Sequence, residues 1–386
     1  FRVIHNGLDL DAIYFRPERR EEVRKAMGWE GQKVIGHVGR FNEQKNHRFL
    51  VAVFAEIHRK DPQTRLVLVG KGELEPEIRE LVREKGLEDA VDFLGVRSDA
   101  QTLYQGMDLL LFPSLFEGLS VVLIEAQACD LPCLIINVQR GGPGLGGIQP
   151  SQSDYFQATR GGGHGDYKLL TYAPSTVQEA VDILYYAFDK ADEYRTPVCI
   201  LGDGLLGQIM EPVTFPEMKE MPDPSTKSWA VTGTHHGKDK TLASSIYIDP
   251  NLGEAQNNHL VEKFERIAQK ETQCEEFMCD DAEIILTGYG SVGRIIKSAI
   301  YMLREKGIKA GLVRPITLMP FPTKVYEKYA AKASVKRFLT VELSMGQFVE
   351  DVKLSVMGKK PVDLFTRCGG NIMTPEDVVE KVMEVK

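Results

Sequence analysis

Short apolar segments without polar alternation constrain the fold of this chain more than any other feature. Between residues 34 and 138 they alternate with amphipathic segments of helical length. A strand that is apolar on both sides is buried on both faces, which is typical of a parallel sheet covered by helices. The expected strands are Val34–Val38, Arg65–Val69, Val91–Leu94, Asp108–Phe112 and Cys133–Val138, and the expected helices are Lys45–Lys60, Glu73–Lys85, Ser98–Gln105 and Ser120–Cys129. The sequence predicts a Rossmann-like α/β layer.

A second α/β region follows, with glycine-rich loops at 141–147 and 161–165. Residues 211–250 contain five prolines and are expected to be a domain connection. Ser175 can cap the helix before the strand Pro197–Leu201, and Thr374 with Pro375 marks the start of the last helix. The other expected elements are the strands Lys168–Tyr172, Ile284–Thr287, Ala310–Val313, Arg337–Glu342 and Val362–Phe365, a long polar helix from Glu254 to about Glu276, and the helix Arg294–Glu305.

The bulk composition excludes several classes of protein. At 386 residues the chain has room for two or three domains, and its net charge of −8 gives no reason to expect nucleic acid as a partner. No apolar run approaches the ~20 residues that span a bilayer. The first residues, Phe1–Ile4, include no Met and do not form a signal peptide, so we expect a cytoplasmic protein with an upstream portion missing. Six cysteines without CxxC spacing predict buried free thiols, no metal site and no iron–sulfur cluster on this chain.

Two cations and a glycine follow the first expected strand. Gly39 ends that strand, Arg40 comes next, and Lys45 opens the following helix. A glycine at the carboxyl end of a parallel strand lets a ligand approach the backbone, and two cations beside it suit a diphosphate. Taken alone, Arg40 and Lys45 are more typical of solvated surface charges. Likewise, Glu117 and Glu125 taken alone are ordinary partners of a helix dipole.

Several motifs in a fixed order give this region a more specific interpretation than its single residues do. They are Val3–Asp9, Gly39–Arg40, Val67–Gly72, Phe93–Gly95 and the pair Glu117 and Glu125. On these motifs, residues 1 to about 133 resemble the C-terminal domain of family-4 retaining glycosyltransferases, which have the two-domain GT-B fold. The resemblance implies a nucleotide-sugar donor. Its diphosphate would lie at Gly39, Arg40 and Lys45, its sugar at Glu117, Gly118, Leu119 and Ser120, and its ribose at Glu125. The family's acceptor domain should precede Val3, so we expect donor binding without a complete transfer site.

A second group of motifs begins at Arg140, which precedes the glycine turn Gly141–Gly147. These residues alone are typical of a surface loop with one arginine. They are followed by Gln149–Ala158, Gly161–Asp166, Gly202–Gly204, Leu312–Thr317 and Pro320–Pro322. With these motifs, residues 131–386 resemble the alpha-type subunit of 2-oxoacid:ferredoxin oxidoreductases, and look closest to the branched-chain (2-ketoisovalerate) type. His164 lies in one of the family's motifs, although such a histidine is more often structural or solvated.

The second resemblance implies an oxidoreductase subunit that depends on other chains. Thiamine diphosphate with Mg would be shared with a partner subunit, and electrons would pass through iron–sulfur clusters on other subunits to ferredoxin. Coenzyme A would take the acyl group. Arg140 would pair with the carboxylate of the 2-oxoacid, a natural task for a guanidinium group. The family's segment before Asn137, which carries the acid that activates the cofactor, is replaced here by the glycosyltransferase-like sequence.

A rival motif lies near the C-terminus. Gly288–Gly293 has the form GxGxxG between an expected strand and an expected helix, which is the setting of a dinucleotide-binding loop. The acidic residue that should follow about 20 positions later is missing, because the next strand ends in Arg314. Since an arginine suits a 2′-phosphate, NADP stays open as a minor alternative.

The two resemblances meet in a segment that we call the join, residues 130–136, where a helix is followed by Leu-Pro and an apolar strand. We predict four parts: 1–133, the nucleotide-sugar-binding half; 134–210, a partial pyrimidine-type domain; 211–280, a linker and long helix; and 281–386, a domain like the transketolase C-terminal domain. Packing is expected to be worst around Gln139–Asp166. Three functional hypotheses follow: an oxidoreductase subunit fused to a donor-binding domain, a retaining glycosyltransferase, and an inactive fusion or assembly artefact.

Overall fold

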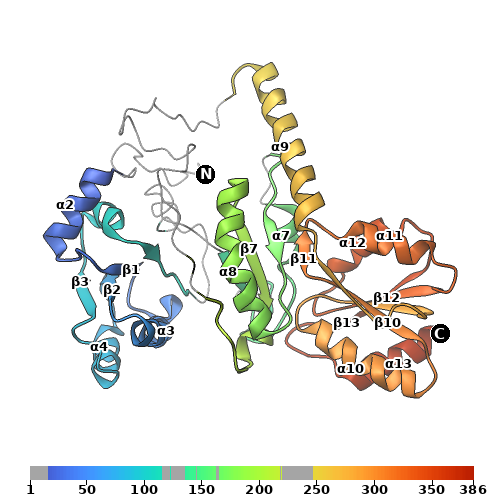
Figure 1. Ribbon diagram of the computed structural model, residues 1–386. Coiled ribbons are helices and arrows are strands. Elements are labelled where there is room, and N and C mark those ends of the chain that lie inside the picture. Colours follow the sequence, from blue (N-terminus) through green and yellow to red (C-terminus); the bar gives the residue numbers. More distant parts are fainter. Residues whose placement is uncertain are drawn as a thin grey trace. The chain divides into compact units, whose positions relative to one another are not determined.

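The computed structural model describes residues 16–114, 122, 135–144, 146–161, 165–217, 219 and 247–386. These residues form two compact units (Figure 1). Unit 1 contains the described residues up to 122, and unit 2 contains those from 135 onward.

Unit 1 is built on a four-stranded parallel sheet in the order β3-β2-β1-β4. Its strands are β1 (Lys33–Val38), β2 (Thr64–Val69), β3 (Val91–Gly95) and β4 (Leu109–Leu110). Its helices are α2 (Pro17–Met27), η1 (Glu43–Lys45), α3 (His47–Lys60), α4 (Glu75–Glu84), α5 (Ala100–Leu103) and η2 (Tyr104–Gly106). Apart from β4, these strands agree with the sequence prediction to within one residue at each end.

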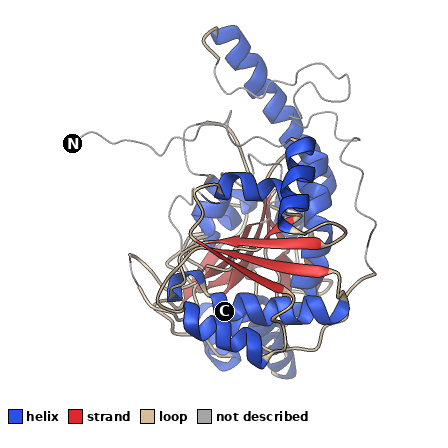
Figure 2. Ribbon diagram, turned by 90° about the vertical axis from the view of Figure 1, so that its left-hand side faces the viewer, coloured by secondary structure: helices blue, strands red, loops and turns tan. Residues whose placement is uncertain are grey.

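Helices cover both faces of this sheet. Successive residues of β2 point to opposite faces of the sheet. Val67 packs with Trp29, which follows α2, and Leu68 packs with Phe54 of α3. All four of these side chains are fully buried or nearly so. The uninterrupted apolar pattern of the strand is therefore explained by burial on two faces, as predicted. Figure 2 shows strands enclosed by helices in this way.

Strand β4 is shorter than predicted at both ends, and Asp108 directly precedes it. Its carboxylate accepts the backbone N–H of Val34 at 2.7 Å, a donor on the neighbouring strand. Arg20 and Arg24 of α2 pair with the same carboxylate at 2.5 and 3.2 Å. The N–H of Asp108 also donates to the carbonyl of Val34 at 2.8 Å, so the side chain adds to the backbone pairing and attaches α2 to the sheet edge. Helix α2 itself was not predicted.

Unit 2 contains two sheets. The first has the order β11-β6-β7-β5, with β5, β7 and β6 parallel and β11 antiparallel to β6. Its strands are β5 (Ile135–Gln139), β6 (Leu170–Tyr172), β7 (Val198–Asp203) and β11 (Thr317–Met319). The helical segments beside it in the chain are α7 (Tyr155–Arg160), α8 (Val177–Tyr194) and η3 (Leu206–Gln208). The short antiparallel strand β11 was missed because its sequence lies inside a proline-rich connection.

The second sheet of unit 2 has the order β13-β12-β9-β10-β8 and is parallel except for β8. Its strands are β8 (Cys274–Phe277), β9 (Ile284–Thr287), β10 (Ala310–Pro315), β12 (Arg337–Glu342) and β13 (Val362–Thr366). The helices are α9 (Pro250–Glu271), α10 (Val292–Glu305), α11 (Thr323–Ala331), α12 (Phe348–Val356) and α13 (Pro375–Val385). In Figure 1, α11 and α12 lie on one side of this sheet and α10 and α13 on the other.

One hydrophobic core joins the two sheets of unit 2. It contains Leu201 of the first sheet, Ile285 and Phe338 of the second, and Tyr155 and Ala158 of α7. Tyr155 is fully buried, and its hydroxyl donates to Asp351 of α12 at 2.5 Å. The expectation of poor packing around Gln139–Asp166 is therefore wrong for the stretch around Tyr155. Most exposed residues of that segment lie in the loops on either side of α7, and Gln157 and Arg160 are exposed on the outer face of the helix.

Two helix starts differ from the prediction by a few residues. Thr176, and not Ser175, caps α8, because its side chain accepts the N–H of Glu179. The Glu179 carboxylate in turn accepts the N–H of Ser175 at 2.6 Å, which completes a reciprocal arrangement. Helix α9 begins at Pro250 behind the cap Asp249, four residues before the predicted start. The last helix begins as predicted, with a capping box formed by Thr374 and Asp377.

Candidate functional site

The carboxyl edge of the unit 1 sheet is formed by two loops that share backbone contacts. The N–H of Gly39, after β1, donates to the carbonyl of Val69 at 2.9 Å. Gly70, after β2, has a φ of +142°, and a Cβ on it would lie 2.0 Å from the Gly39 carbonyl oxygen. Only glycine fits this position, because both the backbone conformation and the space exclude a side chain. The two loops thus expose backbone at the edge where ligands bind in parallel α/β sheets.

Both predicted cations of unit 1 lie on the first of these loops. Arg40 is exposed, and its guanidinium lies 3.6 Å from the Glu73 carboxylate, a loose surface pair. Lys45 ends η1, where the Asn42 side chain accepts its backbone N–H, and its Nζ lies 4.5 Å from the centre of the Phe112 ring. These contacts place two positive side chains and Gly39 on one short loop, as the sequence predicts.

Two buried histidines lie behind this loop and were not singled out from the sequence. His37 of β1 and His47 of α3 are 0% and 1% exposed, and their ring centres are 4.7 Å apart. Burial, followed by the neighbouring His47 and then Lys45, lowers the pKa of His37 to about 3. Burial and then Lys45 lower the pKa of His47 to about 4. Both imidazoles are therefore neutral at physiological pH. A sequence signal existed, because both residues are polar and occupy apolar positions of their elements.

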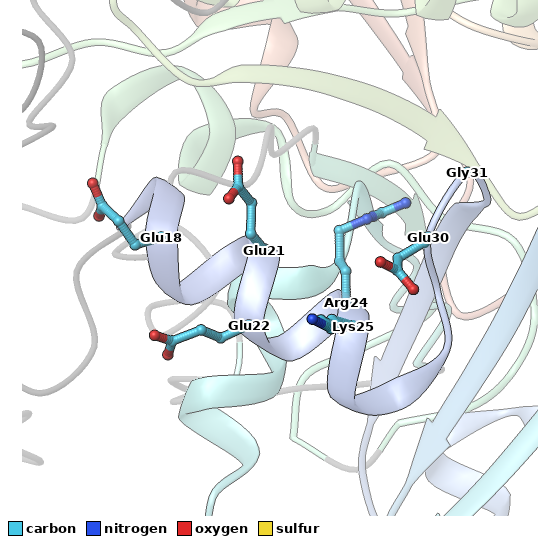
Figure 3. Close-up of a pocket in the computed structure, with 7 residues that line it drawn as sticks. All are labelled: Glu18, Glu21, Glu22, Arg24, Lys25, Glu30 and Gly31. Carbon is cyan, nitrogen blue, oxygen red and sulfur yellow. The ribbon is translucent and has the colours of Figure 1, made fainter.

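Five predicted sugar and ribose contacts lie outside the described residues. They are Glu117, Gly118, Leu119, Ser120 and Glu125, and His164 of unit 2 lies outside them as well. A shallow depression of about 560 Å³ on unit 1 lies elsewhere, on α2 and the turn after it. In Figure 3 its carboxylates, among them Glu18, Glu21 and Glu22, are spread along the helix and do not converge on one point. No predicted site residue lines it, so it is not the candidate site.

In unit 2, Arg140 lies where strand β5 enters its glycine loop. Its Nη1 donates to the carbonyls of Gly141 at 3.3 Å and Gly147 at 3.4 Å, so that the guanidinium is held against the loop. Gly146 has a φ of +49°, and a Cβ there would lie 1.9 Å from the Gly141 oxygen. The loop is closed by backbone bonds from Gly141 to Gln149 and from Gly147 to Gly141, both 2.9 Å. The glycines thus form a tight turn around Arg140.

Beside this loop a buried polar cluster joins the two sheets of unit 2. The side chain of Gln152 donates to the carbonyl of Tyr289 at 2.9 Å and accepts the N–H of Leu343 at 3.1 Å. The carboxylate of Asp203 accepts the N–H groups of Ser291 at 2.9 Å and Leu206 at 3.0 Å, and the Gln152 amide at 3.3 Å. These six residues are at most 9% exposed. The side chains of Gln152 and Asp203 thus bond to groups of the chain itself, which is typical of a structural network, and the buried hydroxyl of Ser291 is left without a partner among the described residues.

This cluster overturns the dinucleotide-binding hypothesis for Gly288–Gly293. The Asp203 carboxylate lies at the start of α10, the place that a pyrophosphate would take, and a Cβ on Gly290 would lie 2.7 Å from it. Arg314, suggested for a 2′-phosphate, is 4% exposed and donates to Glu179 at 2.8 Å and Glu275 at 2.6 Å. The NADP alternative is wrong, because the protein itself supplies both the anion and the partners of the arginine.

The described cysteines do not form a reactive or metal-binding site. Cys199 and Cys279 are buried, Cys274 is partly buried, and Cys368 is exposed, in contrast to the expectation of burial. Burial raises the pKa of Cys199 to about 12 and that of Cys279 to about 11, which keeps these thiols protonated. Within the described ranges, no three His, Cys, Asp or Glu side chains are grouped to hold a metal ion. In the same ranges no helix is long and apolar enough to span a membrane.

Three family models match this chain. Residues 19–144 match glycosyl transferases group 1. Residues 120–275 match the pyruvate flavodoxin/ferredoxin oxidoreductase, thiamine diP-binding model, and residues 282–378 match pyruvate:ferredoxin oxidoreductase core domain II. The first two matches overlap at residues 120–144, which include the predicted join.

The individual relatives are likewise either oxidoreductase subunits or glycosyltransferases. The ketoisovalerate oxidoreductase subunit VorB of Methanothermobacter thermautotrophicus is 44% identical over 269 residues, which cover 70% of this chain and 74% of VorB. EpsF of Bacillus subtilis, named as a glycosyltransferase, is 40% identical over 134 residues, 34% of this chain and 35% of EpsF. A solved structure of 2-oxoglutarate:ferredoxin oxidoreductase from Magnetococcus marinus, with 2-oxoglutarate, coenzyme A and succinyl-CoA bound, has a TM-score of 0.60 at 20% identity. The similarity covers 95% of this chain and 64% of that one.

Proposed function

Because the chain belongs to the 2-oxoacid:ferredoxin oxidoreductases, as an alpha-type subunit fused to a group 1 glycosyltransferase domain, we propose that its larger part serves oxidation of a branched-chain 2-oxoacid. The observation that carries this proposal is the 44% identity to a ketoisovalerate oxidoreductase subunit, against 32% to a 2-oxoglutarate synthase subunit. In this proposal, residues 134–210 are a partial pyrimidine-type domain, 211–280 a linker with a long helix, and 281–386 a domain like the transketolase C-terminal domain.

Arg140 is the residue that we assign to the substrate. Its guanidinium lies on a glycine-rich loop, so that much of the loop backbone carries no side chain that would keep an incoming molecule away. A guanidinium group held in one orientation suits a planar carboxylate, because it donates two parallel hydrogen bonds. The role proposed for Arg140 is to bind the carboxylate of the 2-oxoacid and to fix the direction of its carbonyl group.

Thiamine diphosphate enters through a partner chain in this proposal. The family model over residues 120–275 describes a thiamine diphosphate-binding domain. The described glycine turn at Gly290 does not fit its diphosphate, because the Asp203 carboxylate lies 2.7 Å from the position of a Cβ there. We therefore place the diphosphate and Mg on a partner subunit. Iron–sulfur clusters, coenzyme A and ferredoxin likewise belong to the proposed complex.

The test is assembly followed by activity. The full chain is produced together with thiamine-binding and ferredoxin-like subunits of a branched-chain enzyme, and reduction of ferredoxin is followed with 2-ketoisovalerate, 2-oxoglutarate and coenzyme A. We expect co-purification and a preference for 2-ketoisovalerate. Arg140→Ala should lower kcat/KM at least a hundredfold, whereas Arg266→Ala, on the exposed side of α9, should change it less than twofold. Failure to co-purify would contradict the proposal.

A second candidate function belongs to residues 1–133, which we propose bind a nucleotide-sugar donor. The loop with Gly39, Arg40 and Lys45 and the backbone contact at Gly70 support diphosphate binding there. Glu117, the Gly118–Ser120 backbone and Glu125 complete the proposed sugar and ribose contacts. The chain spans about a third of EpsF, so glycosyl transfer requires an acceptor domain from elsewhere. Calorimetric titration with UDP-, ADP- and GDP-glucose tests donor binding, and a Lys45→Ala variant should bind the diphosphate at least tenfold more weakly.

The remaining hypothesis, an inactive fusion or assembly artefact, has its own test. No Lys or Arg lies between Arg97 and Arg140, so trypsin releases one peptide, Ser98–Arg140, that spans the join. Detection of this peptide by mass spectrometry in the native source is expected if the two parts are one protein. Recovery of peptides from both parts without it would favour an artefact.

A further inference from the structure

Four buried polar atoms without a hydrogen-bond partner lie at the carboxyl edge of the described unit 1 sheet. They are Nε2 of His37, Nδ1 and Nε2 of His47, and Oγ of Ser114. His37 is near the end of β1, His47 opens α3, and Ser114 follows β4. A buried polar atom that bonds to nothing disfavours the folded state. Several of them gathered beside Gly39 and Lys45 therefore indicate groups whose partner is a ligand.

The position of His37 is fixed by its other nitrogen. Nδ1 lies 2.9 Å from the carbonyl oxygen of Leu111, which can only accept, so Nδ1 carries the proton and Nε2 is an acceptor. Nε2 lies 3.0 Å from the place that a Cβ on Gly39 would occupy. The absence of a side chain at Gly39 thus leaves this acceptor directly beneath the loop of the proposed diphosphate site.

His47 supplies the complementary group. It stays neutral, because burial and Lys45 lower its pKa to about 4, and a neutral imidazole has one N–H donor and one acceptor nitrogen. Its ring stacks on Phe41 at 4.1 Å and meets the edge of His37, so it cannot turn toward solvent without disturbing that stack. No side chain caps the first turn of α3, of which His47 is the first residue. Together the two rings offer an acceptor and a donor within one small volume.

We propose that His37 and His47 bind a hydroxyl group of the donor sugar beside Gly39, an inference that rests on the proposed donor site of unit 1. A hydroxyl donates to Nε2 of His37 and accepts the N–H of His47, so it gives a partner to one nitrogen of each ring. An unprotonated phosphate oxygen has no proton to give and would leave Nε2 of His37 unpaired. The diphosphate therefore belongs to Arg40 and Lys45, and the sugar hydroxyl to the histidines.

Replacement by phenylalanine separates binding from packing. The ring is kept and the nitrogens are removed, so a purely structural role predicts unchanged ligand affinity whatever the change in stability. We expect instead that His37→Phe and His47→Phe, in the full chain, each weaken binding of UDP-glucose at least tenfold in calorimetric titrations. Binding of UDP, which lacks the sugar, should change less than twofold. The unfolding temperature should stay the same or rise for His47→Phe, and it should be the same or lower for His37→Phe, which also loses the hydrogen bond to the Leu111 carbonyl.

Two further variants serve as controls. His58→Phe lies on the same helix, but its Nδ1 is already 3.1 Å from the carbonyl of Thr64, and it should bind UDP-glucose like the unmodified chain. His47→Gln keeps a donor and an acceptor, so it should bind more tightly than His47→Phe, and it decides the matter if a phenylalanine variant does not fold. Unchanged UDP-glucose affinity in both phenylalanine variants, or an equal loss for UDP, would overturn the assignment. An unmodified chain that binds none of UDP-, ADP- and GDP-glucose would overturn the donor site itself.

Discussion

Two glycine-containing turns in this chain occupy similar places after a strand but have different surroundings. The turn after β1 in unit 1 contains Gly39, and the turn after β9 in unit 2 contains Gly288, Gly290 and Gly293. Each follows a buried parallel strand and leads into a helix, so each satisfies the local requirements of a phosphate-binding loop. In unit 2 the Asp203 carboxylate accepts a backbone N–H of the turn. In unit 1 no such carboxylate is present among the described residues, and His37 and His47 have nitrogens without partners.

The difference shows that glycines in a turn indicate its backbone conformation but not whether the turn binds a ligand. Gly293 is required because a Cβ there would lie 2.4 Å from Arg314, a contact within the protein. A turn of this kind can bind an anionic ligand only when no carboxylate of the protein already accepts its backbone N–H groups. Substitutions in each turn, and the stability of each unit, test this difference.

The largest effect is expected from removal of the anion in unit 2. Asp203→Ala leaves the N–H groups of Ser291 and Leu206 and the Gln152 amide without an acceptor, in a place that water does not reach. Each unsatisfied donor costs about 1–3 kcal/mol, so the free energy of unfolding of unit 2 should fall by about 3 kcal/mol or more. Urea denaturation followed by circular dichroism measures the change. Asp203→Asn keeps one carbonyl acceptor and should lose less; equal stability of all three proteins would contradict the assigned network.

The second prediction concerns pH and unit 1. The pKa values of His37 and His47 in the folded protein, about 3 and about 4, lie below the usual value of 6.5. The unfolded chain therefore binds more protons, and the stability contributed by the neutral rings is complete above pH 6.5 and decreases as the pH falls. At pH 5 the loss should be about 2 kcal/mol for each ring.

Fluorescence of the buried Trp29 can follow this acid sensitivity in unit 1. Denaturation is measured between pH 7.5 and pH 5 for the unmodified chain and for the double variant His37→Phe/His47→Phe. The double variant should be nearly insensitive to pH in this range. A slope that persists in it would assign the acid sensitivity to other groups.

The part of the fold that sequence could predict is the part that local patterns determine. The strand Arg337–Glu342 was predicted to the residue, because its apolar run is long and bounded by polar segments. Helix α2 was missed because its inner face is held by Arg20 and Arg24, residues that look like surface charges until Asp108 is placed beside them. The same reason explains His37: the carbonyl that its Nδ1 contacts belongs to Leu111, 74 residues away in sequence, and no local pattern connects them.

The third prediction compares the same substitution in the two turns. Gly293→Ala forces a Cβ against the buried stem of Arg314, which is held by Glu179 and Glu275, and should destabilise unit 2 by about 1–3 kcal/mol. Gly39→Ala meets His37 Nε2 at 3.0 Å and the flexible Lys45 stem at 3.3 Å, so its stability should change by less than about 1 kcal/mol. Only Gly39→Ala should weaken binding of UDP-glucose, by about tenfold in the same titrations. The opposite distribution of the two effects would show that the unit 2 turn is the binding loop.

The smallest effect on stability is expected at Arg40, which is the counterpart of Arg314. Arg314 is 4% exposed and forms ion pairs with Glu179 and Glu275. The side chain of Arg40 is 72% exposed, and its guanidinium forms a loose pair with Glu73 at 3.6 Å. Since exposed ion pairs contribute about 0–1 kcal/mol, Arg40→Ala should leave the unfolding midpoint of unit 1 almost unchanged. Its affinity for UDP should nevertheless fall about tenfold, because a charged hydrogen bond to a phosphate is worth more than a surface pair. Glu73→Ala is the matched control: it removes the competing carboxylate and should bind UDP at least as tightly as the unmodified chain. If Arg40→Ala lowers stability but not affinity, the exposed loop of unit 1 is held together by Arg40 rather than prepared for a ligand.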